Sequence, residues 1–138
     1  MSLKGGRGAP LAGADVVRQL WTLFQARAWD EAEKLLAKDF KAWWPHTREH
    51  IPTPEAFIEL NRIYPEPWTI HLRHVHDAGD TVIAEVRVEH PGGNSYCASV
   101  ARVEKGRITR LVEYWVDDAG PTPTWRIHLA RTFDTLPD

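Results

Sequence analysis

The second half of the chain contains four consecutive segments in which apolar and polar residues alternate. They are TIHLRHVHD (69–77), TVIAEVRVEH (81–90), SYCASVARVE (95–104) and RITRLVEYWVDD (107–118). In the second segment every other residue from Val82 to Val88 is apolar, as in a strand that packs one face on a core. Each of the three intervening turns contains glycine, which adopts the positive φ angles of tight hairpins. The sequence therefore predicts a meander of four long antiparallel strands.

Apolar residues at helical spacing predict three helices ahead of this meander. The first spans ADVVRQLWTLFQARAW, with Asp15 as its N-cap. The second begins at Asp30, which lies three residues before Glu33 as in a capping box. The third begins at Thr53-Pro54, a favoured pair for the N-cap and the first helical position.

Two further segments show period-two alternation. KDFKAWWP (38–45) predicts a strand that ends at Pro45 and turns Trp44 inward. The tail holds Trp125, Ile127 and Leu129 at period two, which predicts an added edge strand or a cover for the sheet. The element order predicts an α+β fold. We expect a cone-shaped, curved antiparallel sheet wrapped around three helices of the N-terminal half, with a pocket at its open end.

Composition and charge restrict the location and partners of the chain. Residues 1–11 are glycine-rich and predict a disordered N-terminal segment, followed by a single domain over residues 12–138. The 17 basic and 19 acidic residues leave a net charge of -2, without a basic field for nucleic acid. No apolar run approaches the length of about 18 residues that a membrane span needs, and no signal-peptide core is present. With one cysteine, Cys97, the sequence predicts a soluble cytoplasmic protein that binds neither nucleic acid nor membrane.

Two local patterns are distinctive: Ala28-Trp29-Asp30 leading to Asp39-Phe40, and GRITRLVEYWVDD near the end of the chain. They resemble the SnoaL-like group of the nuclear transport factor two-like superfamily. Three further motifs resemble an uncharacterised subgroup of SnoaL-like proteins. They are Trp44-Pro45, the helix end from Asn61 to Pro65, and Glu113-Tyr114-Trp115. By element order the resemblance covers roughly residues 14–130. It implies the cone-shaped α+β fold and a homodimer formed through the outer face of the sheet.

The resemblance implies less about activity. The superfamily includes cyclases, isomerases, dehydratases, epoxide hydrolases and carrier proteins. Members similar to ketosteroid isomerase have an acidic residue before the proline that ends the first strand, and Trp44 occupies that position here. SnoaL-like cyclases place an acidic residue on the last strand for acid–base work, and Glu113 matches that placement.

Glu113 is the first candidate for chemistry. In the last long strand it shares a face with Thr109, Leu111 and Trp115. If that face lines the pocket, burial among tryptophans raises the pKa of the carboxyl and makes it a proton shuttle. If the same face is the outer one, Glu113 is paired across a dimer with Arg110 or Arg102. The sequence leaves both orientations open.

His46 and Arg48 follow the first strand, near the expected mouth of the cone. His46 could exchange protons at neutral pH, and Arg48 could bind a carboxylate or an enolate. The alternative for both is a solvated loop.

Five residues are candidates for ligand binding around these groups. Asn61 and Tyr64 lie on the apolar stripe of the third helix, where a polar group needs a ligand or a neighbouring carbonyl as partner. Tyr64 and Tyr96 are, with Arg48, candidate donors to an enolate. Trp44 and Trp115 would hold a flat ligand, or would fill the cavity themselves.

The histidines of 69–77 raise the question of a metal. His74 and His76 share a strand face, whereas His71 lies on the other, and no acidic partner is placed beside them. We therefore predict no metal and no cofactor. The leading hypothesis is a cofactor-independent cyclase, isomerase or lyase that acts on a small apolar or aromatic ligand through Glu113. The alternatives are a ligand-binding protein without turnover and a dimeric protein-contact domain.

Overall fold

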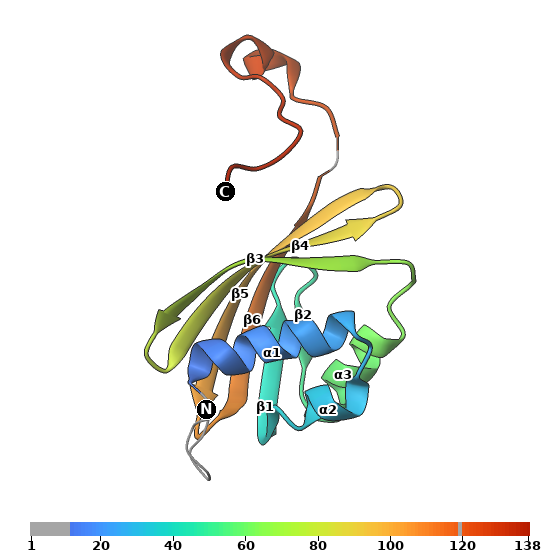
Figure 1. Cartoon of the computed structure of the whole chain (residues 1–138). Coiled ribbons are helices and arrows are strands. Elements are labelled where there is room, and N and C mark those ends of the chain that lie inside the picture. Colours follow the sequence, from blue (N-terminus) through green and yellow to red (C-terminus); the bar gives the residue numbers. More distant parts are fainter. Residues whose placement is uncertain (1–11, 119) are drawn as a thin grey trace.

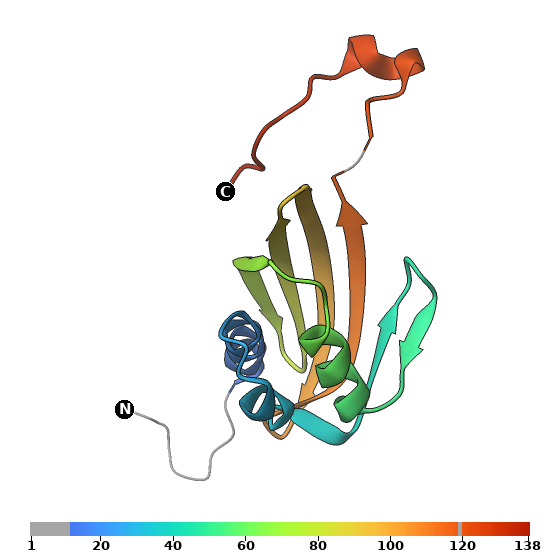
Figure 2. The same ribbon diagram turned by 90° about the vertical axis from the view of Figure 1, so that its right-hand side faces the viewer.

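Six strands form one curved, unclosed sheet, and the helices lie on its concave face (Figures 1 and 2). The computed structural model describes residues 12–118 and 120–138, so the predicted disordered segment 1–11 lies outside the described residues. The helices are α1 (Gly13–Gln25), α2 (Trp29–Glu33) and α3 (Pro54–Arg62). The strands are β1 (Leu36–Trp44), β2 (Glu49–Ile51), β3 (Thr69–Ala78), β4 (Thr81–His90), β5 (Gly93–Glu104) and β6 (Arg107–Asp117).

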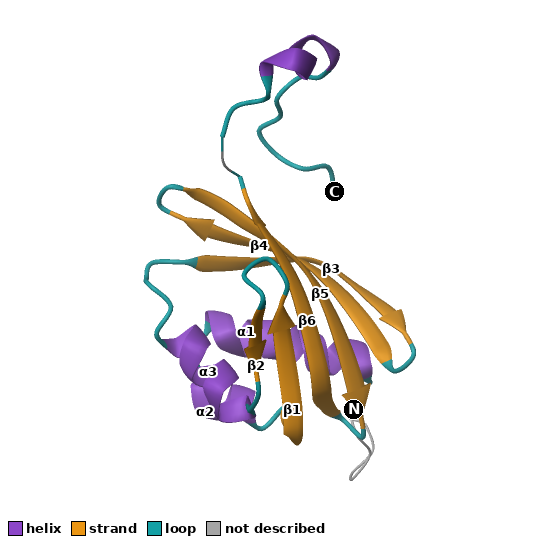
Figure 3. Ribbon diagram, turned by 180° about the vertical axis from the view of Figure 1, so that it is seen from behind, coloured by secondary structure: helices purple, strands orange, loops and turns teal. Residues whose placement is uncertain are grey.

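The predicted four-strand meander is confirmed as β3 to β6, whose neighbours all pair antiparallel. The strand order across the sheet is β2-β1-β6-β5-β4-β3 (Figure 3). The sheet is not wholly antiparallel as expected, because β1 pairs with β6 in parallel. The chain leaves β1 through β2 and α3 and returns at the opposite edge, so the last strand of the meander arrives beside β1 in the same direction.

The helix boundaries correct two predicted caps. Helix α1 begins at Gly13 with Ala12 as its N-cap, so Asp15 lies in the first turn, where its charge favours the helix dipole. Helix α2 begins at Trp29 with Ala28 as its N-cap, and no side chain caps it. The cap of α3 is confirmed, because the Thr53 hydroxyl accepts a hydrogen bond from the Ala56 N–H at 3.1 Å.

The core lies between the helices and the sheet. The ring of Phe57 on α3 lies 5.9 Å from Phe24 of α1 and 5.2 Å from Phe40 of β1, measured between centroids. All three phenylalanines are fully buried. They fill the space beneath α1 and α3, and the hollow of the sheet stays open farther along β4, β5 and β6.

The tail forms neither an edge strand nor a cover for the sheet. Residues Thr124–Leu129 form a 3-10 helix, and Trp125, Ile127 and Leu129 are exposed. The 3-10 helix stands away from the body of the molecule (Figure 1), and the end of the tail turns back to β3, where the Arg73 guanidinium donates to the Pro137 carbonyl at 2.5 Å. Among the described residues, no helix has the length and apolar character needed to cross a membrane.

Candidate functional site

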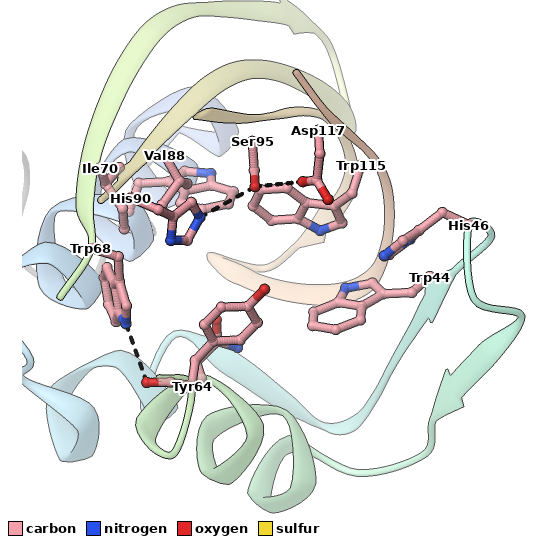
Figure 4. Close-up of a pocket in the computed structure, with 12 residues that line it drawn as sticks. Trp44, His46, Tyr64, Trp68, Ile70, Val88, His90, Ser95, Trp115 and Asp117 are labelled. Carbon is pink, nitrogen blue, oxygen red and sulfur yellow. Dashed lines mark hydrogen bonds between the residues drawn. The ribbon is translucent and has the colours of Figure 1, made fainter. Parts of the chain in front are cut away.

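A cavity of about 120 Å³ lies at the open end of the sheet (Figure 4). Four tryptophans from different parts of the chain line it: Trp21 of α1, Trp44 of β1, Trp68 ahead of β3 and Trp115 of β6. We call this cavity the aromatic pocket. Its other lining residues are His46, Asn61, Tyr64, Ile70, Val88, His90, Ser95 and Asp117.

The indole rings meet nearly at right angles. The Trp115 ring lies 6.5 Å from Trp21 at 66° and 6.4 Å from Trp44 at 71°, both between centroids. Such edge-to-face pairs are favoured by the quadrupole of the rings. The buried N–H of Trp21 has no hydrogen-bond partner among the described residues. The walls therefore present flat apolar faces to the cavity.

Glu113 lies behind two of these walls. Its side chain is on the inner face of β6 and is only 2% exposed. Its Oε1 accepts the N–H of Trp44 at 2.8 Å and the N–H of Trp115 at 3.4 Å. Burial raises the pKa of the carboxyl to about 7, against the opposing effect of the two indole donors. The carboxyl thus sits beneath the pocket wall, and its pKa lies near neutral pH.

Trp68 is held in place by Arg27. The guanidinium lies 3.3 Å from the centroid of the Trp68 ring and donates to the Trp68 carbonyl at 2.7 Å. It also binds Glu66 at 2.7 and 2.8 Å. Arg27 belongs to the turn between α1 and α2, so this cluster ties that turn to the entrance of β3. It fixes one wall of the pocket.

A chain of three polar side chains forms the rim on the sheet side. The Ser95 hydroxyl donates to Asp117 Oδ1 at 2.7 Å, and it lies 3.2 Å from His90 Nε2. None of the three was predicted from the sequence as a site residue. Two signals were present, since Asp117 has the same parity as Glu113 on β6 and His90 the same parity as Val88 on β4.

Among the residues predicted from sequence, five line the aromatic pocket: Trp44, His46, Asn61, Tyr64 and Trp115. The Asn61 amide donates to the carbonyl of Phe57 at 2.8 Å, which satisfies part of its polarity within α3.

Arg48 and Tyr96 lie elsewhere. Arg48 is exposed in the turn between β1 and β2 and does not line the pocket. Tyr96 points to the outer face of the sheet, because its neighbours Ser95 and Cys97 point inward on the same strand. It lines a shallow hollow between β3, β4 and the end of the chain. The structure therefore corrects the expectation that these two residues steady a ligand in the pocket.

Two of the three histidines of β3 lie beside carboxylates of β4. His71 Nε2 lies 3.0 Å from Glu89, and His74 Nε2 lies 4.0 Å from Glu85. Across residues 12–118 and 120–138, no three histidine, cysteine or acidic side chains gather as a metal site would require.

The sequence matches a known protein family. Residues 17–111 match the SnoaL-like domain, and the chain belongs to this family within the nuclear transport factor two-like superfamily. No curated protein matches the sequence significantly.

Solved structures share the fold at low identity. A candidate ketosteroid isomerase from Kribbella flavida DSM 17836 superposes with a TM-score of 0.78 at 23% identity, over 88% of this chain and 90% of that one. A nuclear transport factor two-like protein of unknown function from Burkholderia xenovorans LB400 gives 0.71 at 19%, over 87% and 94%. An epoxide hydrolase from M. tuberculosis gives 0.63 at 16%, over 75% and 81%. At these identities the likeness concerns the fold.

Proposed function

We propose that this protein binds a small, planar and mainly apolar molecule in the aromatic pocket and exchanges a proton with it through Glu113. The support for binding is the pocket itself: four indoles and a few convergent polar groups are the usual composition of a small-molecule site. The support for proton exchange is the single carboxyl buried beneath two of those indoles, with its pKa raised to about 7.

The two carboxyl oxygens of Glu113 have different roles in this proposal. Oε1 accepts both indole N–H groups, so Oε2 is the oxygen that carries the exchangeable proton. A ring held against Trp44 and Trp115 brings an acidic C–H next to a carbonyl toward this group. His46 is the second proton-exchanging group of the proposal, because its ring lies 5.7 Å from the Trp44 ring at the pocket wall. Such a transfer needs an acid–base group and hydrogen-bond donors, so the proposal includes no cofactor.

One observation favours a second candidate function, ligand binding without turnover. Glu113 is not among the residues that line the pocket, and both of its contacts go to indole N–H groups. A carboxyl in this place also serves to orient Trp44 and Trp115. In that case the pocket binds its ligand and releases it unchanged.

Deuterium uptake separates the two functions. We expect the protein to accelerate exchange of the α-protons of single-ring enolisable ketones, such as cyclohexanone and cyclohex-2-enone, in D2O, as followed by proton NMR. Glu113→Gln keeps acceptors for both indoles and should lower the rate by about 10² to 10⁴. Binding of the ketones should be unchanged. Equal binding to both proteins without exchange in either would remove the acid–base role and leave the binding function.

A further inference from the structure

Three strands bring the polar rim of the pocket together. His90 ends β4, Ser95 lies near the start of β5 and Asp117 ends β6. Ser95 and Asp117 are directly opposite in the β5–β6 register. All three line the aromatic pocket, and Figure 4 shows them in one hydrogen-bonded row. We call this row the rim chain.

A neighbouring contact fixes the backbone on both sides of the rim chain. Asp118 accepts the Asn94 N–H at 2.9 Å and the Asn94 side-chain amide at 3.1 Å. Arg87 in turn donates to the Asn94 side chain at 2.9 Å. These bonds hold the start of β5 against the end of β6, so the distances within the rim chain are set by the sheet.

The direction of the protons along the rim chain follows from the number of donors. Ionised Asp117 only accepts, so the single proton of the Ser95 hydroxyl points to it at 2.7 Å. The Ser95 oxygen is then left to accept from His90 Nε2, which must carry a hydrogen. In the neutral ring this leaves Nδ1 without a proton. His90 therefore presents an acceptor at the pocket wall.

The surroundings of this acceptor disfavour an anionic ligand. Asp117 brings a carboxylate to the rim, and no lysine or arginine is found among the described residues that line the pocket. A ligand carboxylate would meet a like charge without compensation. A neutral hydroxyl can donate to His90 Nδ1. In Figure 4 the Tyr64 hydroxyl points into the space between His90 and Trp44, where it can donate to the oxygen of the same ligand.

The size of the pocket limits the ring system. Its volume is about 120 Å³. A buried apolar cavity of about 150 Å³ accommodates benzene. One ring therefore fills the enclosed part, and any further group of the ligand must lie toward the mouth.

From these observations we propose that the rim chain is a binding site for the hydroxyl of a neutral, single-ring phenol or enol. The ligand O–H donates to His90 Nδ1, and Ser95 and Asp117 hold the imidazole in the tautomer that can accept it. If the proton moves fully, the O–H bond breaks and an N–H bond forms, which gives a phenolate or enolate beside an imidazolium. His90 keeps its Nε2 proton and its hydrogen bond to Ser95, whose hydroxyl donates to Asp117, so the Asp117 carboxylate stabilises the imidazolium. This inference rests on the ligand-binding part of the proposed function and does not depend on Glu113.

Three probes of one shape test the proposal by calorimetry: p-cresol, toluene and p-toluate. We expect the protein to bind p-cresol roughly tenfold more tightly than toluene, and p-toluate more weakly than either. His90→Phe should abolish the advantage of p-cresol and leave toluene binding within about twofold. His76→Phe, on the outer part of β3, is the matched control and should change neither. Tight binding of p-toluate, or a His90→Phe variant that keeps its preference for p-cresol, would overturn the inference.

A second measurement reads the tautomer directly. The ¹⁵N shifts of His90 should report a protonated Nε2 and a bare Nδ1 in the free protein, and a mixture in Ser95→Ala. Ser95→Ala should lower p-cresol affinity while the fold is retained. The opposite tautomer would also overturn the inference. If toluene binds as tightly as p-cresol, the hydroxyl site at the rim chain is wrong, but ligand binding in the aromatic pocket is retained. If none of the probes binds, the proposed ligand-binding function is wrong as well.

Discussion

At the scale of single residues, Glu113 couples the stability of the fold to pH. Burial raises the pKa of its carboxyl to about 7 from the ordinary value of 4.5. The folded state therefore binds the proton more tightly than the unfolded state, and stability falls as pH rises from about 4.5 to about 7. Above that range the buried carboxylate costs roughly 3 kcal/mol. We expect Glu113→Gln to match the natural protein at pH 4.5 and to exceed its stability by up to roughly 3 kcal/mol at pH 8.

Urea unfolding at the two pH values measures this difference. Glu85→Gln, on the outer face of β4, is the control, because that side chain is about half exposed and should change stability little at either pH. A stability difference for Glu113→Gln that is the same at both pH values would show that the carboxyl is not charged by the transition from acid to neutral pH.

At the scale of elements, α3 depends on its N-cap. It has nine residues and delivers Asn61 to the pocket, and Tyr64 follows directly after it. Removing the Thr53 side chain leaves the Ala56 N–H without its acceptor at 3.1 Å. We expect Thr53→Ala to destabilise the protein by about 1 kcal/mol, measured by urea or thermal unfolding.

Thr53→Ser separates the cap from other losses at this position, since serine keeps the hydroxyl and should restore most of the stability. If serine and alanine destabilise equally, the methyl group of Thr53 and not its hydrogen bond supports α3.

At the scale of the whole molecule, the outer face of the sheet carries apolar side chains on β6 that none of the described elements covers. Tyr114 is 52% exposed and Val116 is 63% exposed, both on β6. Exposed apolar patches of this kind mark contacts with other molecules. We expect a homodimer through this face, with Val116→Lys shifting the mass measured by light scattering toward the monomer.

Ile63 offers a matched control, because it is also 63% exposed but ends α3 on the helical side of the molecule. Ile63→Lys should leave the dimer intact. A protein that is monomeric at all concentrations, or that responds equally to both substitutions, would place the contact elsewhere.

Local patterns were sufficient to predict most of the elements. Strands β3 to β6 follow from alternation, and the start of α3 follows from Thr53-Pro54. Alternation also placed Trp44 inward and grouped Glu113 with Leu111 and Trp115 on one face. It did not place the starts of α1 and α2, because Ala12 and Ala28 cap these helices through backbone groups alone.

The sequence alone therefore determined which side chains share a face of each strand, because side chains alternate along every extended strand whatever its neighbours are. The order of the helices also followed from the sequence. Which face of β6 is concave, and which residues meet there, was decided by folding. Ser95 reaches Asp117 across 22 positions only through the β5–β6 register, and Trp44 reaches Glu113 across 69 positions only because β1 lies beside β6. Strand pairing and curvature depend on the packing of the whole chain, so they brought together a carboxyl, two indoles and the rim chain that no local pattern connects.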